Sequence, residues 1–117
     1  MKVLNVSCPV NVAALDEPDP KAGNASHNYA IQFGGPKDLC SIQFQHGPRG
    51  VAGSINGVFE DALMAILQDR LEGFQSGEFA CPENATALDA IKAAREAMNL
   101  RVARRMAKGV LGINEQH

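Results

Sequence analysis

A chain of 117 residues can bury one modest core, so its length excludes two independently folded domains and predicts a single domain over residues 1–117. Aromatic residues make up 5% of the chain and tryptophan is absent, which favours close helix packing over an aromatic-rich sheet. With so little bulk to bury in one copy, we also expect self-association into a homo-oligomer.

The near-neutral net charge of −2 conceals a separation of acidic and basic residues along the chain. Residues 60–89 carry seven acidic side chains against one arginine, a balance of −6. Residues 92–108 carry six basic side chains against one glutamate, a balance of +5. The sequence therefore predicts a polar molecule whose positive charge is gathered near its carboxyl end.

The cysteines indicate a reducing environment. Cys8, Cys40 and Cys81 are odd in number and share no ligand-like spacing, so they support neither a disulfide framework nor a zinc site. The first 13 residues are too short and interrupted for a signal peptide, and no segment approaches a membrane span. We therefore expect a cytoplasmic protein with no membrane partner.

The amino-terminal part, residues 1–57, is predicted to hold strands and loops. A short strand is expected within residues 1–10, and the prolines and glycine of residues 16–24 indicate a loop. Alternating apolar residues predict strands over 28–33 and 41–45, joined by a turn at 34–38. Their inner face is expected to carry Ile31, Phe33, Ile42 and Phe44.

The glycine-rich segment 45–57 surrounds Arg49. It has two interpretations: a flexible connector, or a concavity in which exposed backbone N–H groups and the guanidinium bind an anion.

Residues 58–108 are predicted to form an antiparallel helical hairpin. The first helix begins near Val58, with Asn56 as its N-cap, and ends between Gly73 and Gly77. Pro82 suits the first turn of a second helix that runs to about Ala107 and is ended by Lys108-Gly109, followed by a short tail over 109–117. The fold class is therefore α+β, with a small antiparallel sheet followed by a helical hairpin.

The sequence does not predict an enzyme. His27, His46 and His117 are expected at the surface, without an acidic residue at a spacing that suggests a metal site or a proton relay. Cys81 lies at a helix start, but it has no recognisable base beside it. We expect no catalytic group, no metal and no cofactor.

Four residues of the hairpin are candidates for binding a ligand. Arg101 and Arg105 lie on one helix face and can grip phosphate, or they can simply complement the helix dipole. Phe74 can plug the core or offer a platform for a stacked base. Asn84 can cap its helix or read the edge of a purine.

The combination of these features resembles the phage Thoeris anti-defence sponge family, whose hairpin is shared with the anti-CBASS sponges. The resemblance covers roughly residues 27–112 and rests on FQHGPRGVAGSINGVFEDAL, LEGFQSGEFACPENATAL, the Arg101-x-x-x-Arg105 pair and the Lys108-Gly109-Val110-x-Gly112 ending. This chain departs from the family pattern at Lys108, where an arginine is usual, and at Leu111, where an acidic residue is usual.

The resemblance implies a function without turnover. Members of the family hold cyclic ADP-ribose isomers made by TIR-domain proteins, glycocyclic ADP-ribose among them, inside the host cytoplasm, and some relatives also bind CBASS cyclic oligonucleotides in a second pocket. It implies that Phe74 stacks on the adenine, that Asn84 hydrogen-bonds to the ligand and that Arg101 and Arg105 hold the pyrophosphate. It further suggests Arg49 for the second pocket, and leaves open whether dimers assemble into hexamers.

Asn84 and Arg101 are seventeen residues apart, which is about 25 Å along a continuous helix. That distance exceeds the length of such a ligand, so either the helix breaks or each pocket is built from two chains. We favour antiparallel helices that cross at a two-fold axis. We expect no nucleic-acid partner, because the acidic residues of 60–89 would repel a duplex. Two rival interpretations remain at this point: a basic helical module that binds nucleic acid through residues 92–108, and an oligomerisation domain that binds no ligand.

Overall fold

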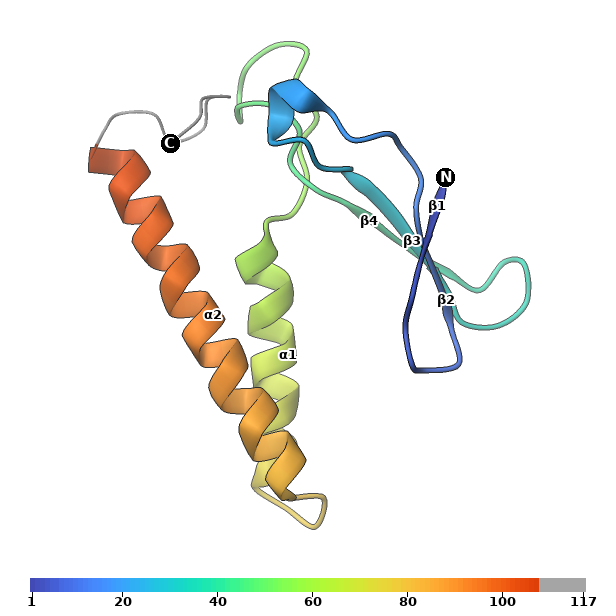
Figure 1. The fold of residues 1–117 in the computed structure, drawn as a ribbon, viewed down its shortest axis with the longest axis vertical. Helices are drawn as coiled ribbons and strands as arrows, with labels where there is room; N and C mark the ends of the chain where they lie inside the picture. Colours follow the sequence, from blue (N-terminus) through green and yellow to red (C-terminus); the bar gives the residue numbers. More distant parts are fainter. Residues whose placement is uncertain (108–117) are drawn as a thin grey trace. The chain divides into compact units, whose positions relative to one another are not determined.

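The computed structural model describes residues 1–107, which divide into two compact units. The first comprises Met1–Val58 and holds all four strands, whereas the second begins at Phe59 and holds both long helices (Figure 1). The predicted α+β class, with an antiparallel sheet followed by two helices, is confirmed. No helix within residues 1–107 has both the length and the apolarity that a membrane crossing requires.

The first unit is a meander of four antiparallel strands in the order β1-β2-β3-β4. The strands are β1 (Lys2–Leu4), β2 (Asn11–Ala14), β3 (Asn28–Gln32) and β4 (Leu39–Gln43). Both predicted strands of the central hairpin are present, and the predicted turn is closed by the Phe33 N–H, which donates to the Asp38 carbonyl at 3.0 Å. The strand predicted within residues 1–10 is β1, but its partner β2 was not predicted from the sequence.

One face of the sheet is apolar because its register aligns Val12 with Ile31 and Tyr29 with Ile42. Phe44 extends this face and meets the Tyr29 ring edge-on, with 5.6 Å between centroids. The prediction for Phe33 was wrong: its side chain is 59% exposed, because the chain leaves the strand at Gln32 and enters the turn.

A polar cluster joins the loops of the first unit. The Asp16 carboxylate accepts hydrogen bonds from the backbone N–H groups of His27 and Asn28, at 3.0 and 2.9 Å. The His27 ring stacks on His46 with 3.9 Å between centroids, and His46 Nε2 lies 2.8 Å from Asp19 Oδ2. His27 is only 6% exposed, so the prediction that it lies at the surface was wrong. The cluster ties the loop around a short 3-10 helix, η1 (Pro20–Ala22), to the start of the glycine-rich segment.

The first long helix, α1, spans Glu60–Gln75 and carries Glu60 and Asp61 in its first turn, where their charge suits the helix dipole. Its N-cap is Phe59, and no side chain caps it. The predicted N-cap, Asn56, was wrong, because its side-chain oxygen instead accepts a hydrogen bond from Gln45 Nε2 at 3.1 Å. The end of α1 is closed at Ser76, whose hydroxyl donates to the Gly73 carbonyl at 2.7 Å.

The second long helix, α2, is continuous over Pro82–Ala107, with the proline in its first turn as predicted. It packs antiparallel against α1 along a half-buried seam that includes Leu71, Leu88 and Ile91, and no residue of either helix is fully buried. The hairpin therefore leaves much of its apolar surface open in a single copy. The predicted helix end at Lys108-Gly109, the departure at Leu111 and the tail lie outside the described residues.

Candidate functional site

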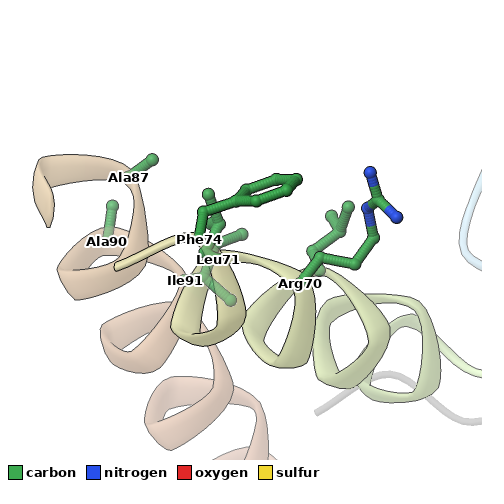
Figure 2. Close-up of a pocket in the computed structure, with 7 residues that line it drawn as sticks. Arg70, Leu71, Phe74, Ala87, Ala90 and Ile91 are labelled. Atoms are coloured by element: carbon green, nitrogen blue, oxygen red, sulfur yellow. The ribbon is translucent and has the colours of Figure 1, made fainter. Parts of the chain in front are cut away.

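A pocket of about 490 Å³ opens on one side of the hairpin, between the second half of α1 and the first turns of α2. This volume lies within the usual range for small-molecule sites. Figure 2 shows Arg70, Phe74, Ala87 and Ala90 rising on the same side of the two helices. The lining is formed by Leu67, Arg70, Leu71, Phe74, Ala87, Ala90 and Ile91.

Phe74 forms an aromatic wall of this pocket and is half-buried rather than enclosed in a core. The Phe79 ring approaches it edge-on, with 6.4 Å between centroids and 78° between planes. The small side chains of Ala87 and Ala90 leave space beside the ring. A flat aromatic group could stack there, because such rings gain from stacking on an aromatic platform without any particular hydrogen-bond pattern.

Asn84 lies in the first turn of α2, close to the loop that joins the helices. Its backbone N–H donates to Cys81 Sγ at 3.4 Å, and its side-chain nitrogen donates to the Phe79 carbonyl at 3.3 Å. Asn84 therefore orders the connecting loop, and it is not among the residues that line the pocket. Phe79 links the two candidates, since its ring contacts Phe74 and its carbonyl contacts Asn84.

Arg101 and Arg105 lie in the last described turns of α2, remote from the pocket. Arg101 is exposed and Arg105 is half-buried. The pKa of Arg105 is lowered from its ordinary value, first because burial penalises its charged form and then because Arg101 repels it. Since α2 is unbroken, Asn84 and Arg101 lie about 25 Å apart along the axis. One chain thus presents the aromatic group and the guanidinium pair as two separate clusters.

Arg49 belongs to the other compact unit. Its Nη1 donates to Gln45 Oε1 at 3.2 Å, and the same oxygen accepts the Gly57 N–H at 3.0 Å. Three nearby glycines, Gly47, Gly50 and Gly53, adopt positive φ angles, which explains why glycine is needed in this loop. The loop is thus folded around Gln45 rather than being a featureless connector.

Arg70 was missed by the sequence analysis. Its guanidinium carbon lies 5.3 Å from the centroid of the Phe74 ring, within the range of a cation–π contact. The available signal was its spacing, because residues four apart on a helix lie on the same face.

The described residues offer no group of three His, Cys, Asp or Glu side chains that could hold a metal ion. The Asp19–His46 pair was also missed, because 27 residues separate its members. The hydrogen bond from His46 is the largest cause that lowers the pKa of Asp19 below its ordinary value.

The comparison with known families decides where the chain belongs. The sequence model for the Acb2/Tad1 hairpin domain matches residues 36–103, which include the pocket and Arg101. This chain is a member of the Acb2/Tad1 hairpin family. The family predicted from the sequence is thereby confirmed, although Arg105 lies two residues beyond the matched range.

The chain is also similar to a protein from a phage. The chain is 36% identical over 96 residues to Thoeris anti-defense 1 of Bacillus phage SBSphiJ7, a match that covers 82% of this chain. The match covers 66% of the phage protein, so the chain spans about two thirds of that relative's length.

Proposed function

We propose that this protein is a phage sponge that binds a cyclic ADP-ribose signal, glycocyclic ADP-ribose in particular, and withholds it in the cytoplasm of the infected bacterium. The observation that supports this proposal most directly is the aromatic-walled pocket of the hairpin, in a chain that is similar to a Thoeris anti-defense protein. Binding alone would block the signal. The protein would act by holding it intact, with no chemical step and no cofactor.

The ligand's two halves need different chemistry, and the chain carries both kinds. Phe74 offers a stacking surface for adenine. Asn84 is linked to this aromatic wall through Phe79 and would hydrogen-bond to the ligand. Arg101 and Arg105 offer two guanidinium groups, which suit a pyrophosphate through charge-assisted hydrogen bonds. Phosphate contacts would also offset both causes that lower the pKa of Arg105, first the burial of its charge and then its repulsion by Arg101.

These groups lie too far apart in one chain, and the unbroken α2 removes the possibility that a helix break brings them together. We therefore assign each pocket to two protomers, with Phe74 and Asn84 from one protomer and the arginines from its partner. A homodimer with two-fold symmetry would hold two equal pockets. A hexamer would be a further assembly of such dimers.

The exposed apolar residues of α2 support self-association. Leu100 and Met106 are 73% and 62% exposed in a single copy, on the same stretch of helix as the two arginines. Exposed apolar side chains on a helix favour association with another helix. A second copy would cover them and carry the arginines to a pocket at the same time.

Sequestration requires high affinity, because the sponge must compete with the receptor of the signal. Nanomolar binding corresponds to about 12 kcal/mol. Two charge-assisted phosphate contacts and one stacked base, enclosed between protomers, are of the right kind to supply it.

The proposal also includes a second pocket for CBASS cyclic oligonucleotides at the glycine-rich loop. Arg49 is exposed there, and backbone N–H groups of a glycine-rich loop can line an anion-binding concavity. An Arg49→Ala variant should lose binding of cyclic oligonucleotides while it keeps its affinity for cyclic ADP-ribose.

The test of the main proposal is recovery of the signal. The protein is loaded with glycocyclic ADP-ribose, separated from excess ligand and heated until it unfolds, and the released compound is analysed by mass spectrometry. We expect the unaltered ligand in near-stoichiometric amount. A product of altered mass would show turnover, and an empty protein would show that it is not a sponge for this signal.

The same preparation also tests the alternative that the protein binds nucleic acid. Steeply salt-dependent binding of duplex or single strands, without binding of the cyclic nucleotide, would favour a basic helical module instead.

A further inference from the structure

Arg70 is the one charged residue in the lining of the hairpin pocket. The other six lining residues are apolar or aromatic. Arg70 lies one helical turn before Phe74, and Figure 2 shows both side chains on the same side of α1. Because Arg70 is exposed, its charge stays hydrated, and a partner in the pocket would serve to orient its side chain.

The Phe74 ring is that partner. The guanidinium carbon lies 5.3 Å from the ring centroid, while Phe79 approaches the ring edge-on from the connecting loop. Although Asp69 and Glu72 are close along the chain, the described residues show no ion pair between Arg70 and a carboxylate. Arg70 and Phe79 together flank the aromatic wall.

We propose that Arg70 is a positioning residue of the pocket, which holds the Phe74 ring in the orientation needed to stack on a purine. This inference rests on the proposed function, because it assumes that adenine binds against Phe74. A half-exposed phenylalanine loses side-chain freedom when a ligand immobilises it, and this loss lowers affinity. A ring that Arg70 already orients would lose less side-chain freedom on binding.

The alternative role for Arg70 is direct contact with the ligand, since a guanidinium can also bind phosphate. A double-mutant cycle distinguishes the two roles. If Arg70 acts through the ring, its replacement matters only while the ring is present. If Arg70 contacts the ligand directly, its replacement matters equally in both backgrounds.

The cycle uses calorimetric titration of glycocyclic ADP-ribose into the full chain and its Arg70→Met, Phe74→Leu and doubly substituted forms. We expect Arg70→Met to weaken binding about threefold, as suits one cation–π contact, and to have no further effect in the Phe74→Leu background. Arg70→Lys should lie between wild type and Arg70→Met, because it keeps the charge but not the planar group. Lys92→Met, which removes an exposed charge outside the pocket lining, is the matched control and should bind as wild type does.

A second measurement needs no ligand. The protein is labelled on its phenylalanine rings, and the NMR signals of Phe74 are identified by their loss in the Phe74→Leu form. Arg70→Met should shift and average these signals. Unchanged signals, or an equal loss of affinity in both backgrounds, would overturn the positioning role while the proposed function stood. Absence of any binding by the wild-type protein would instead overturn the proposed function and this inference with it.

Discussion

Asp61, in the first turn of α1, accepts two hydrogen bonds from the guanidinium of Arg95 in α2, at 2.8 Å to Oδ1 and 3.2 Å to Oδ2. Arg95 also donates a hydrogen bond to Gln68 at 2.9 Å, two turns further along α1. These contacts set the register of α2 against α1. Since α2 continues to Ala107, it runs about 18 Å beyond Arg95. Arg101 and Arg105 therefore lie on a helical extension past the start of α1.

Replacement of Asp61 by asparagine should loosen this register. The hydrogen bonds from Arg95 are the main cause that lowers the pKa of Asp61, and they raise that of Arg95, so the charged pair is favoured in the folded protein. We expect a modest drop in melting temperature, larger at low than at high salt because both side chains are partly exposed. Asp69→Asn, which changes an exposed carboxylate of the same helix, should leave the melting temperature close to that of wild type.

Phe74→Ala should weaken binding of glycocyclic ADP-ribose by about 5- to 150-fold, the range expected when one base loses its aromatic platform. Because the side chain is only half-buried, the circular dichroism spectrum and the assembly state should not change. Calorimetry together with sedimentation measures both properties. Wild-type affinity in this variant would remove Phe74 from the site.

Arg105→Ala should weaken the same binding by about 30-fold or more, because a buried phosphate would lose a charge-assisted partner. Arg105→Lys should recover part of the loss, since it restores the charge without the planar fork. If alanine and lysine at this position both bind as tightly as arginine, the phosphate does not contact Arg105.

The acid stability of the first unit should depend on Asp16. The hydrogen bond from the Asn28 N–H is the largest cause that lowers the pKa of Asp16 below its ordinary value of 3.8. A carboxyl whose pKa is lower in the folded state stabilises the fold above its ordinary pKa, and this contribution is lost as the pH falls through the lower folded value. Urea unfolding of Asp16→Asn should therefore show a deficit at pH 7 that shrinks below pH 3.8, whereas Glu17→Gln should show no such deficit.

Local patterns predicted the elements whose signals lie within a few residues. Pro82 marked the start of α2, and alternating apolar residues located the β3–β4 hairpin. Only one strand of the amino-terminal hairpin was predicted. The other, β2, is four residues long, and it is held as a strand by its pairing with β3, which its own sequence does not indicate.

Long-range contacts decided the features that sequence reasoning missed. Asn56 has the chemistry of an N-cap, but Gln45, eleven residues away, takes its side chain. His27 is buried by its stack with His46, a contact across nineteen residues. The candidate site was predicted as a set of residue types, whereas the pocket itself depends on how Arg70 and Phe74 face Ala87 and Ala90 across the hairpin.

The pocket's division between two protomers can be tested by complementation. Protein carrying Phe74→Ala and protein carrying Arg105→Ala are co-expressed with different tags, and the mixed dimer is purified through both. If each pocket takes Phe74 from one protomer and Arg105 from the other, the mixed dimer keeps one intact pocket. It should then bind one glycocyclic ADP-ribose per dimer at wild-type affinity, against two for the wild-type dimer. Binding no tighter than that of the two mutant homodimers, or a protein that sediments as a monomer with ligand bound, would contradict the shared pocket.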